Sequence, residues 1–228
     1  MDIAECIKNR RSIRKYLNTE IPKDKIGMII EAGLMAPSSG NIHNWNFTVI
    51  KDPEKRGKLA DACLQQHWMT QAPVHIIVCG VEDIAKQFYG LRGEKLYTIQ
   101  NCSACIQNML LMAHSLGLGS CWIGAFDEEM IKNIAGIPDN ARPQAIITIG
   151  VADEKPEPPK REALYNFYYL ENYMNRIEDF DVALGYHGNV ALKKLNTGTE
   201  IAKKQGNKLF DKIQHHSKKL IQDFKQKN

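Results

Sequence analysis

The stretch "NRRSIRKY" near the start of the chain concentrates groups that bind anions. Arg10, Arg11, Arg14 and Lys15 fall within six residues, and Ser12 adds a hydroxyl. Each guanidinium is a planar fork of donors that matches a carboxylate or a phosphate. By itself the stretch fits a phosphate-binding site and a solvated basic helix end about equally well. The chain contains no GxGxxG and no GxxxxGK[ST] motif, so a dinucleotide fold or a nucleoside-triphosphate loop would not hold such a phosphate.

A second candidate is the turn "APSSGNIHNWNF". Ser38 and Ser39 offer hydroxyls, Asn41 offers an amide, and small residues leave the backbone N–H groups uncovered. Such a turn can surround the polar edge of a heterocycle. Serine and asparagine that only cap the turn are the alternative interpretation, with Trp45 as a core residue.

Hydrophobic spacing predicts the elements that must position these residues. We expect helices over residues 2–12, 22–36, 53–71, 94–119 and 127–138, strands over 45–52, 73–81 and 141–153, and an extended piece over 120–126. Four prolines in "EKPEPPKREAL" predict an extended surface segment. Helices that alternate with at least three central strands indicate an α/β or α+β fold.

The composition is that of an ordinary globular protein. The chain has 228 residues, of which 43% are hydrophobic and 25% charged. No apolar run approaches the ~20 residues of a membrane span. Acidic residues stand near the N-terminus, where a secretory signal has basic ones. We therefore expect a cytoplasmic protein.

The six cysteines are scattered, and most lie in apolar contexts. Cys102 and Cys105 form a CxxC, but no second pair completes a four-ligand metal site. Reduced thiols packed in the core are the favoured interpretation, and a metal or redox role is the alternative. We expect no metal.

The end of the chain differs in charge from the rest. Residues 191–228 hold ten lysines and three acidic residues, whereas the whole chain has a net charge of +4. We therefore divide the chain into a domain at 1–178 and a Lys-rich helical extension at 179–228. A helix that covers its own protein is the favoured interpretation of the extension; an anionic membrane surface or a nucleic acid is the alternative.

Four motifs in order give the chain a family resemblance. They are "RRSIRKY", "APSSGNIHNWNF", "QNMLLMAHSLGLGSCWIGAF" and "IITIGVADEKPEPPKR". Together, over residues 1 to about 175, they resemble the FMN-dependent nitroreductase family. The resemblance implies an α+β three-layer sandwich, with a central, mostly antiparallel sheet flanked by helices. It also implies an intertwined homodimer with FMN at the subunit interface.

The resemblance implies roles for particular residues. The N-terminal element would hold the phosphate and reach the pyrimidine ring, and the pair near residue 160 would close on the phosphate. The turn after the second helix would approach the flavin from the partner subunit, one middle segment would present a backbone N–H to the flavin N5, and one polar residue would contact the pyrimidine. The N-terminal element is Arg10, Arg11, Ser12 and Arg14, and the pair near residue 160 is Lys160 and Arg161. The turn is Pro37, Ser38, Ser39 and Asn41. The middle segment is Ile123 and Gly124, and the polar residue is Gln65.

Two departures from the family pattern concern the substrate side. His43, Asn44 and Trp45 stand where many relatives have Gln-Pro-Trp, and an acidic residue that relatives commonly have near Gln100 is missing. The substrate therefore cannot be inherited from the family. Phe88, Tyr89 and Arg92 lie in a region that covers the flavin in some relatives, and packing is the alternative role.

The resemblance implies an FMN-dependent oxidoreductase. It would pass a hydride from NADH or NADPH through the flavin N5 to a nitroaromatic, a quinone or a similar electron-poor acceptor, in a ping-pong cycle. Because the flavin performs this chemistry, we expect no catalytic side chain. The alternatives are a specialised flavoenzyme on the same scaffold (a dehydrogenase, a dehalogenase or a flavin-fragmenting enzyme) and a non-catalytic flavin-binding or redox-sensing protein.

Overall fold

The computed structural model describes residues 2–163 and 166–175. The chain divides into two compact units, of which the first ends at Pro158. The helices of the first unit are α1 (Ile3–Asn9), α2 (Lys23–Leu34), α3 (Pro53–Ala62), α4 (Glu82–Arg92), α5 (Thr98–Ser115) and α6 (Glu128–Ala135). Short 3-10 turns η1 (Ser39–Asn41) and η2 (His67–Gln71) and a π turn η3 (Gly93–Tyr97) complete the helical elements.

The sheet is antiparallel and is organised around one long strand. Its strands are β1 (Tyr16–Leu17), β2 (Trp45–Ile50), β3 (Val74–Val81), β4 (Gly119–Ile123) and β5 (Ala141–Ala152). β5 pairs with β3, with β4 and, at its end, with β1, while β2 pairs with the far edge of β3.

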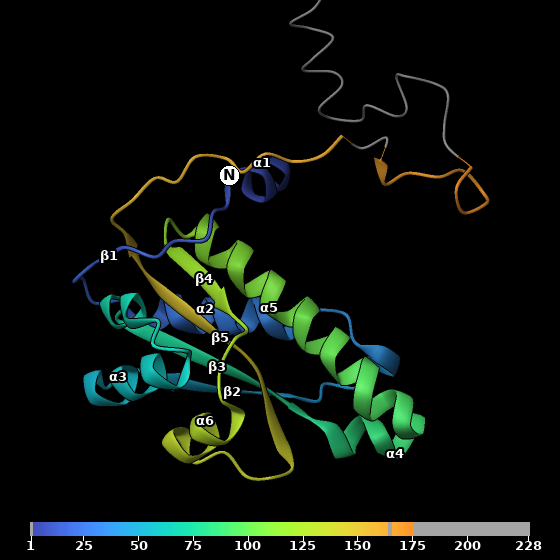
Figure 1. Ribbon diagram of the computed structural model, residues 1–228, viewed down its shortest axis with the longest axis horizontal. Coiled ribbons are helices and arrows are strands. Elements are labelled where there is room, and N and C mark those ends of the chain that lie inside the picture. The colour runs from blue at the N-terminus through green and yellow to red at the C-terminus, as the bar shows by residue number, and fades with distance from the viewer. Residues whose placement is uncertain (1, 164–165, 176–228) are drawn as a thin grey trace, which may run out of the picture. The chain divides into compact units, whose positions relative to one another are not determined.

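Helices cover both faces of the sheet, as Figure 1 shows. Alternate residues of β5 point to opposite faces: Ile147 and Ile149 join the core under α2 and α5, and Ile146 joins the core under α3 and α6. β3 is buried along nearly its whole length, as expected for a strand covered on both sides. This arrangement confirms the predicted α+β sandwich with a mostly antiparallel central sheet.

Cys102 and Cys105 lie in the core on the inner face of α5. Burial raises the pKa of each thiol to about 12, so both stay protonated at neutral pH. Gly33 of α2 lies against this face, since a Cβ there would come within 2.9 Å of the Cys105 sulfur. In the described part of the chain, no group of three or more His, Cys, Asp or Glu is placed to hold a metal ion.

The structure corrects two predicted elements. The helix expected over residues 53–71 ends at Ala62, because Leu64 and Gln65 both have positive φ, at 56° and 59°. Residues 82–92 form α4, which the sequence patterns did not predict. Gly90 interrupts this helix with a φ of 57°, a conformation that glycine adopts without steric cost.

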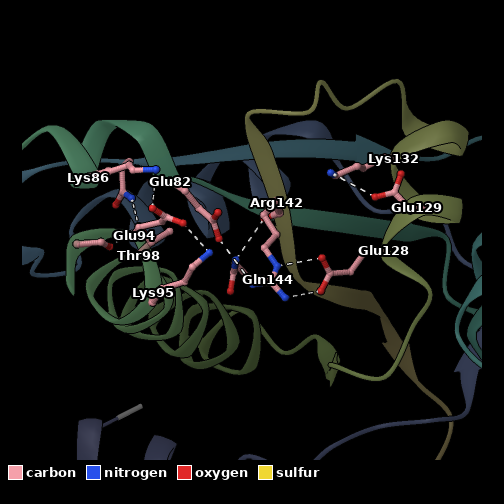
Figure 2. A network of polar contacts seen from close by, with 12 residues as sticks. Glu82, Lys86, Glu94, Lys95, Thr98, Glu128, Glu129, Lys132, Arg142 and Gln144 are labelled. Atoms are coloured by element: carbon pink, nitrogen blue, oxygen red, sulfur yellow. Dashed lines mark hydrogen bonds and ion pairs between the residues drawn. The ribbon is translucent and has the colours of Figure 1, made fainter. Parts of the chain in front are cut away.

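A charged network joins α4, β5 and α6 on the surface (Figure 2). Arg142 of β5 donates two hydrogen bonds to Glu128 of α6, at 2.9 and 2.7 Å, and lies 3.7 Å from Glu82 of α4. The hydrogen bonds from Arg142 hold the pKa of Glu128 below its usual value. Glu94 of η3 pairs with Lys86 and Lys95, and these hydrogen bonds lower its pKa to about 2.

The second unit begins at Pro159. Its described part contains a tight turn in which the Leu170 N–H donates to the Asn175 carbonyl at 2.9 Å. The rings of Tyr169 and Tyr173 lie 5.1 Å apart in this turn. The predicted Lys-rich extension lies outside the described residues, and the predicted division at residue 178 stays a prediction.

Candidate functional site

The N-terminal segment that follows α1 lies along the exposed edge of β4. The Ile13 N–H donates to the Ser120 carbonyl at 3.0 Å. The Ile13 side chain is buried and touches the position where Gly119 lacks a Cβ. Glu154, just after β5, accepts hydrogen bonds from the backbone N–H groups of Arg14 and Lys15. These contacts fix the backbone from which the predicted phosphate-binding side chains project.

Three residues of this segment influence the Cys121 thiol of β4. Burial raises the pKa of Cys121, while the Arg14 charge, the Ser12 hydroxyl and the Arg10 charge each lower it in part. The guanidinium of Arg14 also lies 5.8 Å from the centre of the Trp68 ring, within the range of a cation–π contact. The side chains of Ser12 and Arg14 therefore lie beside the edge of β4.

Arg10 and Arg11 border a cavity of about 710 Å³. The cavity lies among the ends of α1 and α5, the start of β4 and the segment after β5, and His114 and Ser120 also line it. Arg11 uses one terminal nitrogen to donate to the carbonyls of Lys8 and Arg10, at 2.7 and 2.9 Å. These bonds cap the end of α1, and the predicted contact of Arg11 with a phosphate stays a prediction.

Gln65 lies in the strained loop that leads into η2. Two consecutive non-glycine residues in the left-handed region, Leu64 and Gln65, are uncommon and are characteristic of functional loops. The Gln65 carbonyl accepts from the His67 N–H at 2.8 Å, and the next residue, Trp68, lies under Arg14. Gln65 is exposed and belongs to the loop that contacts the N-terminal segment.

Ile123 and Gly124 stand where β4 ends. The Ile123 side chain is buried in the core under α3 and α6, so only its backbone is available to a ligand. Gly124 is exposed, and its nearest neighbour outside the adjacent residues is Trp122. Trp122 points to the opposite side of β4 from Ile123 and is 38% exposed. The sequence analysis missed Trp122, although strand alternation from the buried Cys121 and Ile123 predicts its outward direction.

The turn after α2 lies at the other end of α5. The backbone N–H and the hydroxyl of Ser39 donate to Asn101 Oδ1, at 2.9 and 3.2 Å. Gly40 has a φ of 58°, and a Cβ there would overlap the Tyr89 hydroxyl. Asn101 and His114 are thirteen residues apart on one helix, which corresponds to roughly 20 Å. The turn and the cavity are therefore well separated within one chain, and α1 and α4 mark these two ends of α5 in Figure 1.

The predicted site residues thus fall into three groups. Arg10, Arg11, Ser12, Arg14, Gln65, Ile123 and Gly124 gather around the edge of β4 and the adjoining loop; Pro37, Ser38, Ser39 and Asn41 form the distant turn; Lys160 and Arg161 are exposed residues of the second unit. The predicted contacts of the last two with a phosphate stay predictions.

Comparison with known proteins assigns the fold and the site to a family. The Nitroreductase family matches the chain over residues 7–68 and 62–151, which is more than half of its length. The chain belongs to the nitroreductase family. This assignment confirms the resemblance that the four sequence motifs indicated.

Several relatives from this family match most of the chain. A protein of Methanothermobacter thermautotrophicus that carries "NADH dehydrogenase/NAD(P)H nitroreductase" in its name is 36% identical over 160 residues, which cover 68% of this chain and 80% of that protein. A NADH dehydrogenase of Thermus thermophilus is 28% identical over 188 residues, covering 71% and 92% of the two chains. The solved structure of an FMN-dependent nitroreductase from Clostridium difficile superposes with a TM-score of 0.65 at 28% identity, covering 75% of this chain and 99% of that one.

This member of the nitroreductase family has further functional candidates that its sequence motifs did not point to. His114 and Ser120 border the cavity beside Arg10. Asn101 holds the turn after α2.

No helix in the described part of the chain has the length and apolar character to cross a bilayer.

Proposed function

We propose that this protein is an FMN-dependent NAD(P)H oxidoreductase of the nitroreductase type. The observation that carries the proposal is the position of Arg10 and Arg11. These two cations, which the family resemblance assigns to the FMN phosphate, border a large cavity beside the edge of β4. The names of the relatives, which include NAD(P)H nitroreductase and FMN-dependent nitroreductase, support the same function.

The chemistry of the donor set fits FMN. A phosphate monoester carries close to two negative charges at neutral pH, and its desolvation must be offset by several cations. Arg10, Arg11, Ser12 and Arg14 present guanidinium and hydroxyl donors within five residues. Lys160 and Arg161 would close on the phosphate. Arg14 and Gln65 would contact the pyrimidine ring, because both belong to the loops that meet at Trp68.

When bound, the flavin accepts a hydride from the nicotinamide and passes reducing equivalents to an acceptor. The chain's own residues orient it. The backbone N–H at Gly124 would donate to N5, since this exposed glycine offers no side chain that blocks the approach. Cations and donors near N1 and O2, where Arg14 would lie, favour the electron-rich reduced form.

The separation of the two ends of α5 supports a homodimer. Within one chain the turn at Ser39 lies roughly 20 Å from the end of α5 that borders the cavity. We infer that a second subunit supplies the turn, as the family resemblance implies. Large apolar side chains on α1 and near the end of α2 are exposed in the single chain, among them Ile7 at 59% and Met35 at 72%. Such surfaces are typical of protein–protein contacts.

The acceptor would be a nitroaromatic, a quinone or a similar electron-poor molecule, reduced in a ping-pong cycle. NADH or NADPH would bind, transfer its hydride and leave before the acceptor takes its place. A cytoplasmic location stays a prediction from the sequence.

The test is an absorption spectrum of the freshly purified protein, followed by titration with NADH and with NADPH without oxygen. We expect flavin bands corresponding to about one FMN per chain, bleaching by a reduced nicotinamide, and recovery when a nitroaromatic or a quinone is added. A yellow protein that neither nicotinamide bleaches would point to a flavin-binding protein or a specialised reaction. A protein that neither contains nor binds FMN would contradict the proposal.

A further inference from the structure

The turn at Ser39 is held by a buried hydrogen-bond network that begins at η3. The Thr98 hydroxyl donates to the Gly93 carbonyl at 3.0 Å, and Asn44 Nδ2 donates to Thr98 Oγ1 at 2.8 Å. Asn101 Nδ2 donates to Asn44 Oδ1, and Asn101 Oδ1 accepts from the N–H and the hydroxyl of Ser39. Thr98 and Asn44 are fully buried and Asn101 is 3% exposed, so bulk water does not compete for these groups.

Backbone carbonyls fix the direction of the first bonds in this network. A carbonyl can only accept. The Thr98 hydroxyl therefore gives its one hydrogen to the Gly93 carbonyl, and its oxygen must accept from Asn44. The other hydrogen of Asn44 Nδ2 goes to the Val81 carbonyl at 3.1 Å. The Asn44 amide is thereby oriented, with its oxygen turned toward Asn101.

The turn requires the same direction at the other end of the network. The Ser39 N–H can only donate, so Asn101 must present its oxygen to the turn and its nitrogen to Asn44. An amide supplies this acceptor and this donor together. A carboxylate has no donor for Asn44 Oδ1, and an apolar side chain has neither group. The network therefore requires an amide at residue 101, or a carboxyl that keeps its proton.

α4 contacts the same turn directly. The Tyr89 hydroxyl lies over Gly40, where the absence of a Cβ leaves room for it. Gly93 of η3 packs closely on α4, since a Cβ there would overlap the Ala85 carbonyl. The turn is therefore held at two adjacent residues: at Gly40 by α4, and at Ser39 by the network that begins in η3.

We propose that Asn101 is a positioning residue for the flavin site, which fixes the turn at Ser39 through this hydrogen-bond network. The inference rests on the proposed function, because the turn is the part of the second subunit that would contact the flavin. Asn101 is buried and acts through Ser39. Loss of the correct hydrogen-bond direction should therefore weaken FMN binding without removing any group that touches the cofactor.

The first test compares Asn101→Asp with Gln100→Asp, a control at an exposed position of the same helix. Burial raises the pKa of a carboxyl at residue 101. Below that pKa the protonated carboxyl has the acceptor and the donor of the amide that it replaces. Above it the carboxylate can only accept, and it faces Asn44 Oδ1. The affinity for FMN should therefore fall with rising pH in Asn101→Asp and not in the control.

The affinity is measured by fluorescence titration with FMN from pH 5.5 to 8.5, on the full-length chain freed of flavin. Circular dichroism and light scattering verify the fold and the subunit assembly. At pH 5.5 Asn101→Asp should bind FMN within about threefold of the parent, and at pH 8.5 about tenfold more weakly, because buried groups lose their partners. The parent profile is the reference, since it contains the same titratable groups on the adjoining elements: His43 and Tyr89 at the turn, Cys79 of β3, Cys102 of α5 and Glu94 of η3.

The second test changes a residue three hydrogen bonds away from the turn. Thr98→Val keeps the shape of the side chain and removes the hydroxyl, whereas Thr98→Ser keeps the hydroxyl and removes the methyl group that packs against Gly80. The network predicts weaker FMN binding in Thr98→Val than in Thr98→Ser, and packing alone predicts the reverse. Protection of the Ser39 amide from hydrogen exchange should be lower in Thr98→Val as well.

An FMN affinity of Asn101→Asp that equals the parent's at every pH, with Thr98→Val binding no more weakly than Thr98→Ser, would overturn the inference even if the variants are less stable. The proposed function fails in a different way. If the parent does not bind FMN, the proposed function is wrong, and a protection of the Ser39 amide that falls with rising pH in Asn101→Asp alone would still show that Asn101 positions the turn. Unchanged protection in that case would overturn both.

Discussion

The side-chain amide of Asn101 donates to Asn44 Oδ1 at 2.9 Å, and both residues are buried. Asn44 in turn donates to Thr98 Oγ1 at 2.8 Å, and Asn101 accepts from the Ser39 backbone at 2.9 Å. Asn44 stands at one departure from the family pattern, and Asn101 adjoins the other, near Gln100. Hydrogen bonds therefore link the residues at these two departures in one network, which holds the turn at Ser39 against α5.

Replacing Asn101 with alanine should destabilise the protein by about 2–3 kcal/mol, because it leaves the Ser39 N–H and Asn44 Oδ1 without their partner. Urea unfolding measures this loss. The control is Gln100→Ala on the same helix, an exposed position where we expect a change within about 0.5 kcal/mol. Equal free energies of unfolding for the two variants would show that this buried hydrogen-bond network contributes little to stability.

Gly40 and Gly136 allow backbone strain to be separated from a steric clash. Both have positive φ, at 58° and 67°, but a Cβ at Gly40 would overlap the Tyr89 hydroxyl, whereas a Cβ at Gly136 meets open space. Gly136→Ala should cost about 1–2 kcal/mol for the left-handed backbone alone, and Gly40→Ala should cost about 1–3 kcal/mol more.

Adding Tyr89→Phe to the Gly40→Ala variant should recover part of the extra cost, since it removes the closest atom. A double-mutant cycle of thermal unfolding measures this coupling. Additive effects of the two substitutions would mean that Tyr89 does not lie over Gly40.

His75 should make the stability depend on pH below neutrality. Its Nε2 lies 2.9 Å from the Met69 carbonyl, and burial lowers the pKa of the folded imidazole to about 4. The unfolded chain binds the proton with an ordinary pKa of about 6.5, so acid favours unfolding. The His75 contribution is fully present above pH 6.5 and is lost progressively toward pH 4, by about 3 kcal/mol.

The comparison is between the native protein and His75→Gln, whose amide does not titrate. Free energies of unfolding measured from pH 4 to 7.5 should fall less steeply with acid in the variant. Parallel curves for the two proteins would contradict the lowered pKa.

The sequence predicted the central strands well because their signal is local. The run from Val74 to Val81 is nearly all apolar, and the residues from Trp45 to Ile50 are β-rich. The end of α3 was mispredicted because helical spacing continues past Ala62, while the chain turns at Leu64 and Gln65. Left-handed backbone at two non-glycine residues is determined by tertiary contacts and leaves little trace in the pattern.

The candidate site was predicted only in part. The cationic segment and the turn were evident from residue type, because several arginines or several small polar residues occur close together. His114 and Ser120 were missed, since each lies alone in an apolar stretch and comes to the cavity beside Arg11 only through packing of α5 and β4 near the N-terminal segment. Asn101 was missed for the same reason, because its partner Asn44 is 57 residues away.

The phosphate assignment predicts that Arg10→Ala and Arg161→Ala both weaken the retention of FMN. Loss of a charge-assisted contact to the phosphate should raise the dissociation constant about tenfold or more. Flavin released from equal amounts of each purified variant, measured by fluorescence after denaturation, checks this. Lys55→Ala, on the exposed face of α3, should keep the full flavin content. Undiminished flavin in both arginine variants would count against the assignment.

The central claim is that FMN is held by cationic residues from the N-terminal segment. A crystal structure of the protein saturated with FMN tests it most directly. We expect the phosphate within hydrogen-bond distance of the Arg10 guanidinium, with the flavin ring along the edge of β4 near Gly124 and the turn at Ser39 supplied by a second subunit. A flavin bound elsewhere, with the guanidinium of Arg10 pointing into solvent, would contradict the account.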